Sequence, residues 1–275
     1  MTWLPLALFA LAVWSIQRVV TKWALLHWST ARFYRWNAIV SLVVYVPFAL
    51  ALPPEGDRLA GALGLSLLMA LAFWVTTEAT RRGPVGAVAP LTATSPAITA
   101  SLAMLFIGER PDALGLVGIV AAVVAAVLLA FRPARSTFGP WLGLGVASLA
   151  LQGVGAFLAK LVVSDATPTT LLVPSVLVQL AVGLAIARRE PLEPRESVRG
   201  RSLVVTLTLA AAALATVGYL AALSSGPASI IVPLVATSPT IGGVLGIIAL
   251  RERVARHQAI GIAIGLAAIV LLARP

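Results

Sequence analysis

Long apolar runs, separated by short polar breaks, follow one another along the whole chain. Each run holds roughly 20 residues, which is the length of a helix that crosses the hydrocarbon layer of a membrane. Polar and apolar residues do not alternate within the runs, as they would in the strands of a membrane barrel. The pattern predicts ten membrane-spanning helices, over residues 3–22, 31–52, 59–80, 85–107, 112–131, 138–162, 167–188, 200–223, 228–250 and 255–273.

Two stretches of the chain are copies of each other in a constant register, in which position 83 matches position 226 and position 109 matches position 252. The first stretch contains Gly83-Pro84, Pro90-Leu91, Ala93-Thr94-Ser95-Pro96 and Glu109-Arg110, and the second contains Gly226-Pro227, Pro233-Leu234, Ala236-Thr237-Ser238-Pro239 and Glu252-Arg253. Each copy closes a set of five spans, so we predict two repeats, residues 1–133 and 134–275. Because five is odd, the second repeat enters the membrane from the opposite face. The fold class is therefore an all-α polytopic membrane protein whose ten helices form two inverted five-helix repeats.

Composition supports a membrane protein and excludes several functions. Hydrophobic residues make up 60% of the 275 residues and charged residues only 11%, too few to cover a soluble protein. Cysteine is absent, which excludes disulfides and thiolate catalysis. No phosphate-binding Gly-Lys-Ser/Thr loop, no cluster with metal-ligand spacing and no Ser-His-acid set is present. We expect no cofactor, no metal and no enzymatic activity.

The net charge of +10 marks orientation rather than nucleic-acid binding, because Lys and Arg lie between the apolar runs. The connections after odd-numbered spans carry 15 of these residues, and the other connections carry 4. By the positive-inside rule the first face is cytoplasmic, and both chain ends point outward. We expect a multi-pass protein of the inner membrane of a bacterial or archaeal cell.

The repeated pattern Pro-Leu…Ser-Pro…Glu-Arg…Gly, in a chain of ten spans and two repeats, resembles the EamA-type branch of the drug/metabolite transporter superfamily. Trp14 and Lys22 in the first span and Arg35 in the second are also similar to that family. The resemblance implies a secondary transporter, often an exporter, of amino acids and other small metabolites, with a central cavity between the halves. Ten-span members usually keep both termini in the cytoplasm, whereas the charges of this chain place them outside.

Two spans are interrupted by prolines at matching positions. Proline has no N–H and clashes with the carbonyl four residues before it, so these residues are predicted hinges: Pro90 and Pro96, and Pro233 and Pro239. Hydroxyl side chains beside the interruptions are candidate substrate ligands: Thr94 and Ser95, and Thr237 and Ser238. The alternative is that the hydroxyls satisfy the local backbone and the prolines only bend the helices for packing.

Two charged residues lie inside predicted spans. Arg18 lies about one turn before the end of the first span, and Glu78 lies close to the end of the third. A charge inside a span costs about 2.5–3.5 kcal/mol on insertion scales, so its presence favours a function. Both spans run toward the same face, so Arg18 and Glu78 could pair and contact a substrate. The alternative is that both side chains extend to the interface.

Aromatic and amide side chains accompany these charges. Trp14 lies one turn before Arg18 with Gln17 next to it, and Trp74 lies one turn before Glu78. An aromatic plane beside a guanidinium and an amide suits a zwitterionic or anionic metabolite. We therefore predict that Trp14, Gln17 and Trp74 bind substrate, with helix packing as the alternative.

Further polar residues lie within the apolar runs. Tyr219 occupies the repeat position of Thr76 and is a candidate for the cavity lining. Asn37, Gln152 and Gln179 are expected to form hydrogen bonds between helices, and Gln152 is also a candidate substrate ligand.

Charged and aromatic residues near the span ends are expected to have structural roles. Glu109-Arg110 and Glu252-Arg253 are predicted helix-end ion pairs. Four tryptophans fit the aromatic belt at a membrane interface: Trp3, Trp23, Trp28 and Trp141.

These patterns together predict a transporter. We expect an exporter of small polar metabolites such as amino acids, which works by alternating access around a midplane cavity built from spans 1, 3, 4, 6, 8 and 9. A passive channel or a lipid flippase that uses the same cavity is the alternative. The expected partners are a small-molecule substrate and the lipid bilayer, without nucleic acid. Small-residue spacings such as Gly261–Gly265 leave a monomer and a homodimer both open.

Overall fold

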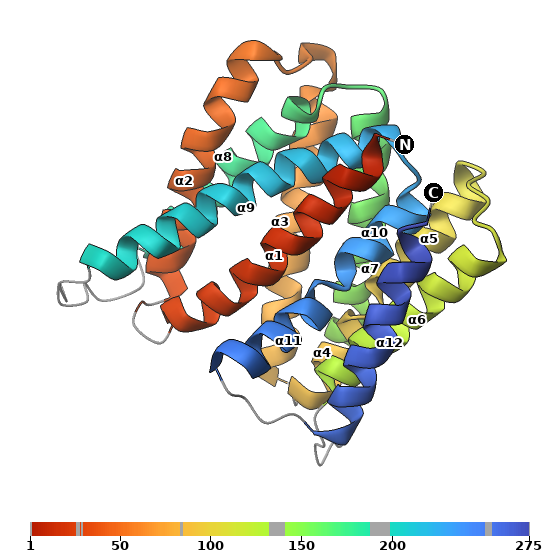
Figure 1. Cartoon of the computed structure of the whole chain (residues 1–275). Coiled ribbons are helices and arrows are strands. Elements are labelled where there is room, and N and C mark those ends of the chain that lie inside the picture. The colour runs from red at the N-terminus through yellow and green to blue at the C-terminus, as the bar shows by residue number, and fades with distance from the viewer. Residues whose placement is uncertain are drawn as a thin grey trace.

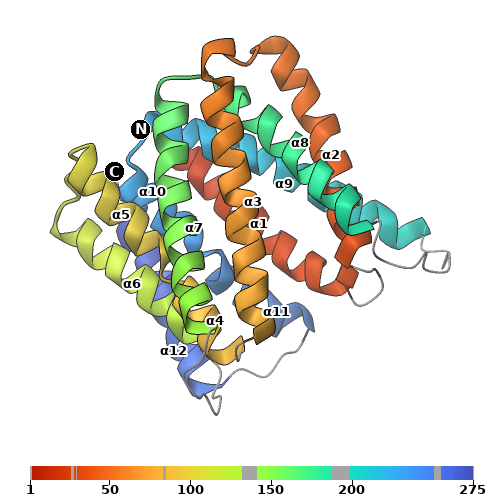
Figure 2. The same cartoon turned by 180° about the vertical axis from the view of Figure 1, so that it is seen from behind.

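The computed structural model describes residues 2–25, 28, 30–82, 85–131, 141–187, 199–250 and 255–274, and every regular element in these ranges is a helix (Figures 1 and 2). The helices of the first half are α1 (Trp3–Leu25), α2 (Thr30–Ala51), the short 3-10 helix η1 (Gly56–Arg58), α3 (Leu59–Arg82), α4 (Val85–Thr92), α5 (Ser95–Phe106) and α6 (Ala113–Ala130). Those of the second half are α7 (Trp141–Ser164), α8 (Pro168–Ala187), α9 (Arg199–Ser225), α10 (Ala228–Ala236), α11 (Ser238–Leu250) and α12 (Arg256–Leu272).

The helices reproduce the predicted spans. Helices α4 and α5 are separated by two residues and together fill the fourth span, and α10 and α11 are separated by Thr237 and fill the ninth. In the described residues, eight helical stretches are long and apolar enough to cross a membrane, and Ser95–Phe106 and Arg256–Leu272 are shorter apolar helices. The expectation of an all-α polytopic membrane protein is confirmed.

Helices α6 and α12, which are the same element of the two repeats, lie against each other in opposite directions. A methyl group on Gly118 would lie 2.9 Å from Leu272, and one on Gly261 would lie 3.3 Å from Leu129, which is the repeat counterpart of Leu272. Gly118 and Gly261 occupy matching positions of the two copies, so one contact is made twice with the partners exchanged. Such reciprocal contacts are the signature of an inverted repeat. The close approach needs glycine, because a side chain would collide with the facing leucine.

Other helix pairs obey the same exchange. Helix α1 packs along α9, and its counterpart α7 packs along α3, while α2 packs on its own counterpart α8. The buried core runs between these pairs and includes Leu11, Leu172 and Leu223. Three of the four tryptophans expected in an interfacial belt are also buried, so that expectation is wrong for them: Trp3 at 8%, Trp28 at 6% and Trp141 at 7% exposure.

Both chain termini lie at one end of the bundle, which we call the terminal end (Figure 1). The connections at 52–58, 107–112, 165–167 and 226–227 lie at this end. The connections of the opposite end fall mostly outside the described residues. These include Glu252 and seven of the fifteen basic residues that predict the orientation in the membrane, among them Arg253.

Candidate functional site

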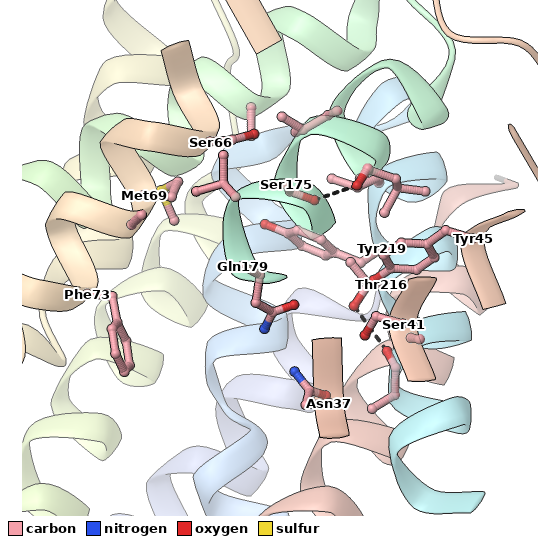
Figure 3. A pocket seen from close by; sticks show the side chains of 18 of the residues that line it. Asn37, Ser41, Tyr45, Ser66, Met69, Phe73, Ser175, Gln179, Thr216 and Tyr219 are labelled. Atoms are coloured by element: carbon pink, nitrogen blue, oxygen red, sulfur yellow. Dashed lines mark hydrogen bonds between the residues drawn. The ribbon is translucent and has the colours of Figure 1, made fainter. Parts of the chain in front are cut away.

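A cavity of about 530 Å³ lies between the two halves of the bundle (Figure 3). Its walls come from α1, α2 and α3 of the first half and from α7, α8 and α9 of the second. We call it the central cavity. Three of the residues predicted from the sequence line it: Trp14, Gln17 and Tyr219.

Aromatic and uncharged polar side chains make up half of the described lining of the central cavity, and aliphatic residues make up most of the rest. The rings of Trp14 and Tyr219 lie 5.2 Å apart and tilted by 52°, and the Trp14 Nε1–H donates to the carbonyl of Ala212 at 3.4 Å. This contact joins α1 to α9 across the two halves. No Asp, Glu, Lys or Arg is among the described residues that line the cavity. The cavity therefore suits a solute without a net charge.

Asn37 on α2 and Gln179 on α8 project their amides into the central cavity (Figure 3). Among the described residues neither amide has a hydrogen-bond partner, so the expected bonds between helices are not formed. Both amides are thus available to a solute. A sequence signal for this wall exists, because Asn37, Ser41 and Tyr45 recur every four residues and share one helix face. Our sequence interpretation did not include Ser41 or Tyr45.

A second cavity, of about 660 Å³, lies beside both interrupted spans, and we call it the break cavity. It is lined from α4 and α5, from α10 and α11, and from α6 and α12, with one residue each from α1 and α7. The predicted residues in its lining are Arg18, Ser95, Gln152, Pro96 and Pro239. The predicted site residues that line a cavity are thus divided between two cavities.

Helix α1 separates the two cavities. Consecutive helical residues are about 100° apart around the axis, so Gln17 and Arg18 face different directions. Gln17 faces the central cavity and Arg18 faces the break cavity. The Arg18 Nε–H donates to the Ser238 hydroxyl at 3.1 Å, which joins α1 to the start of α11.

Glu78 and Trp74 lie apart from both cavities. The Glu78 carboxylate accepts a hydrogen bond from Arg82 Nε one turn later on α3, and the expected Arg18–Glu78 pair is not formed. Trp74 is 60% exposed on the outside of the bundle. An exposed aromatic side chain on a membrane helix is suited to contact with lipid.

The two interruptions have the same backbone geometry. In the first, both the N–H and the hydroxyl of Thr94 donate to the carbonyl of Leu91, at 3.3 and 2.7 Å. In the second, Thr237 makes the same two bonds to Leu234, at 3.1 and 2.6 Å. The hydroxyl hydrogens of Thr94 and Thr237 are therefore used by the local backbone.

The helices break at the threonines rather than at the prolines. Pro96 and Pro239 are the second residues of α5 and α11, where a missing N–H costs little. Pro233 lies inside α10, and Pro90 lies in α4 with its side chain outside the described part of the chain. Whether these prolines act as hinges stays a prediction.

Gln152 on α7 joins the two halves. Its Nε2 donates to the hydroxyls of Thr76 and Ser148, at 3.1 and 2.9 Å. Since Thr76 belongs to α3 and Ser148 to α7, the expected hydrogen bonding between helices is formed at this position. Gln152 also borders the break cavity.

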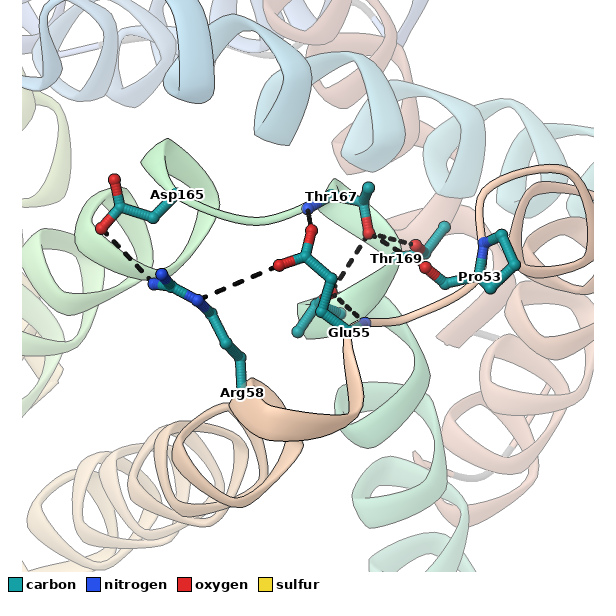
Figure 4. A network of polar contacts seen from close by, with 7 residues as sticks. Pro53, Glu55, Arg58, Asp165, Thr167 and Thr169 are labelled. Atoms are coloured by element: carbon teal, nitrogen blue, oxygen red, sulfur yellow. Dashed lines mark hydrogen bonds and ion pairs between the residues drawn. The ribbon is translucent and has the colours of Figure 1, made fainter.

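A network centred on Glu55 joins the halves at the terminal end (Figure 4). The Glu55 carboxylate accepts the N–H of Thr167 at 2.9 Å, and the Glu55 N–H donates to the hydroxyl of Thr170 at 3.0 Å. Thr169 donates to the carbonyl of Leu52 at 2.6 Å, and Arg58 pairs with Asp165 at 3.4 Å. We call these contacts the Glu55 network. It lies next to the central cavity, because Leu171 and Leu172, which directly follow Thr170, line that cavity.

Glu109 makes a second connection at the same end. Its carboxylate accepts the N–H groups of Ala228 and Ser229, at 2.8 and 2.7 Å, and so caps the start of α10 in the other half. A carboxylate at a helix N-terminus is favoured by the unpaired N–H groups and by the helix dipole. The expected ion pair with Arg110 is not formed, whereas Lys160 nearby donates to the carbonyls of Leu223 and Gly226. In the described residues no group of His, Cys, Asp or Glu could hold a metal ion.

Comparisons with known proteins agree with this geometry. The model of the EamA-like transporter family matches residues 1–131 and 139–274. A solved structure described as "Crystal structure of protein" superposes with a TM-score of 0.78 over 98% of this chain and 95% of its own, at 15% sequence identity. That likeness concerns the fold alone. A comparison with curated proteins finds no match.

Proposed function

The chain belongs to the EamA-like transporter family, and from this premise we propose that it is a secondary transporter that carries small polar metabolites through the central cavity. The observation that carries the proposal is the position of this cavity. Corresponding helices of both repeats form its walls, so a rocking motion of one half against the other would move the opening from one side to the other.

The polar contacts at the terminal end support alternating access. The Glu55 network and the Glu109 cap both join the first half to the second, and the Glu55 network lies next to the cavity. Contacts of this kind must break if the halves separate at the terminal end. We propose that they form the closed gate of that end, and that the solute enters and leaves the present state from the opposite end.

The lining limits the solute. Amides and hydroxyls offer hydrogen bonds, and Trp14 and Tyr219 offer flat apolar faces, whereas no charged side chain is available among the described lining residues. A small metabolite with zero net charge, such as a zwitterionic amino acid, meets these conditions. Export is the direction that we propose, with Trp14, Gln17 and Tyr219 as contacts.

The test is a thermal-shift screen of the purified chain against metabolites, followed by counterflow of the labelled hit in proteoliposomes. A transporter gives saturable counterflow, and replacing Gln179 by Ala raises the half-saturating concentration by about tenfold, because a solute loses one hydrogen bond in a buried site. A conducting pore would instead give single-channel current and flux without saturation, which would reject the proposal.

Alternating access can be tested separately, because the chain contains no cysteine. Arg58→Cys combined with Asp165→Cys places one thiol on each half, where the side chains now meet. Joining the two thiols with a short bifunctional thiol reagent should stop counterflow, and a reductant should restore it. Each single-cysteine variant with the same reagent is the control. Undiminished counterflow in the cross-linked protein would contradict the gate.

A further inference from the structure

We propose that the break cavity is an anion site, in which Arg18 binds the carboxylate of a small organic acid that carries one negative charge. The inference deepens the proposed function. It rests on that function in one respect, because a transporter is expected to bring a solute into this cavity. It concerns a compartment that is separate from the central cavity, and its test needs no transport.

Arg18 occupies an unusual place for a charged residue. It lies in α1 within the apolar stretch Trp3–Thr21, where an uncompensated charge is costly and is retained when it has a use. Its side chain is part of the lining of the break cavity. Thus the guanidinium is accessible to a solute although it lies inside a membrane-spanning stretch.

The charge of Arg18 has no acidic partner within the part of the chain that the structure describes. There, the Nε–H bond to Ser238 is its only polar contact, and no Asp or Glu lines the break cavity. Glu78, the acidic residue expected to pair with Arg18, is bound to Arg82 instead. The positive charge of Arg18 is therefore available to an anion from outside the protein.

The geometry of the guanidinium selects the class of anion. Ser238 accepts from Nε, which fixes the guanidinium plane and leaves both terminal nitrogens to donate. Two parallel N–H groups match the two oxygens of a carboxylate. Arg18 is the only cation in the described lining, so an anion with one charge is neutralised and a phosphate dianion is not.

The remaining lining suits the rest of such a molecule. The cavity of about 660 Å³ offers the Ser95 hydroxyl and the Gln152 amide among small apolar residues such as Ala93 and Ala236. Since Gln152 Nε2 already donates to Thr76 and Ser148, its carbonyl oxygen is the part of the amide that can accept. A carboxylate with a short organic body and a hydrogen-bond donor therefore fits the site.

The experiment measures binding of propionate to the full chain in detergent by saturation-transfer NMR, with propionamide as the uncharged match and inorganic phosphate as the dianion. We expect saturable propionate binding that is at least tenfold tighter than propionamide binding, and phosphate binding no tighter than that of propionate. Arg18→Gln should weaken propionate binding at least tenfold and leave propionamide unchanged. Equal binding of propionate and propionamide by the parent protein would overturn the proposal.

Two further variants separate the site from general charge effects. Arg274→Gln removes one positive charge at the terminal end, away from the cavity, and should bind propionate as the parent does. Arg18→Lys keeps the charge and should retain a preference for propionate over propionamide, even where Arg18→Gln fails to fold. If Arg274→Gln weakens propionate as much as Arg18→Gln does, the site is not at Arg18. Loss of counterflow with propionate binding intact would reject the proposed transport and leave the anion site standing.

Discussion

The two interrupted spans carry the same four residues, Ala-Thr-Ser-Pro, and make the same backbone hydrogen bonds, but they differ in what surrounds them. Thr94 is half-buried, whereas Thr237 is 2% exposed. The local sequence thus dictates the same chain geometry twice. The neighbouring helices decide how each interruption is used.

At matching positions of the two breaks, the side-chain volume of a residue pair is distributed differently between its two members. In the second break, Thr240 of α11 packs directly on Gly265 of α12. The matching positions of the first break are Ala97 and Ala122, two residues of similar size. The summed volume of the pair is nearly kept while its distribution changes, as expected for close-packed helix contacts.

The two breaks also differ in charge, because the arginine beside the second break has an uncharged counterpart beside the first. Trp3 and Trp141 start α1 and α7, so these helices correspond with position 3 matched to position 141. In this register Arg18 corresponds to Ala156. Within the described part of the chain, only the second break therefore has a guanidinium bonded to its serine. The two copies thus share a backbone geometry and differ in charge at the position of Arg18.

Gly265→Ala should give the largest effect, because the new methyl group would overlap the Thr240 side chain, which is 1% exposed and cannot move aside. We expect a loss of about 3 kcal/mol in the free energy of unfolding, the upper range for overpacked cores. Unfolding in mixed detergent micelles measures it.

The matched control gives the second break the residue pair that the first break has. Thr240→Ala with Gly265→Ala recreates the Ala–Ala pair of positions 97 and 122. The double variant should recover most of the lost stability, since neighbouring residues couple strongly. A double variant as unstable as Gly265→Ala would show that the two breaks are not packed alike.

Gly153→Ala and Gly242→Ala compare the helix crossings at the two breaks. A methyl group on Gly153 of α7 would lie 2.6 Å from Ile98 Cβ and 3.0 Å from the Ser95 carbonyl, whereas one on Gly242 of α11 would lie 3.4 Å from the Ser15 carbonyl. The first substitution should cost about 2 kcal/mol. The second should be neutral, or stabilise by up to about 1 kcal/mol because alanine favours a helix over glycine. Equal losses, measured in the same micelles, would mean that both crossings are equally tight.

Thr237→Val and Thr94→Val remove the hydroxyls that bond the backbone at the breaks. Both bonds are short, at 2.6 and 2.7 Å, but only Thr237 is fully buried. The carbonyl of Leu234 would keep the Thr237 N–H as its donor, so we expect a loss of about 1 kcal/mol for Thr237→Val. Thr94→Val should lose less, because this position is only half-buried and water can supply a replacement donor. A larger loss at Thr94 would reverse the assignment of the buried and the accessible break.

The sequence predicted the features that depend on nearby residues. Apolar runs indicated the spans, and the Thr-Ser-Pro copies indicated the interruptions, because helix length and backbone bonding are local properties. It did not predict that Gln17 and Arg18 face separate cavities, since that depends on the rotation of α1 against α9 and α11. The Glu109 cap was also missed, because its partners Ala228 and Ser229 lie in the other half of the chain and a backbone N–H carries no sequence signal.

Ser238→Ala and Ser95→Ala give the smallest expected effect and the most direct comparison of the two breaks as ligand sites. Both serines begin a half-helix at the break, but only Ser238 accepts the Arg18 Nε–H. Removing that acceptor frees the guanidinium to rotate, so propionate affinity should fall about threefold, the worth of one modest hydrogen bond. Ser95→Ala should change it less than about twofold, because Ser95 lines the cavity without holding Arg18. If Ser95→Ala lowers propionate affinity more than Ser238→Ala does, the carboxylate binds at the first break and not at the second.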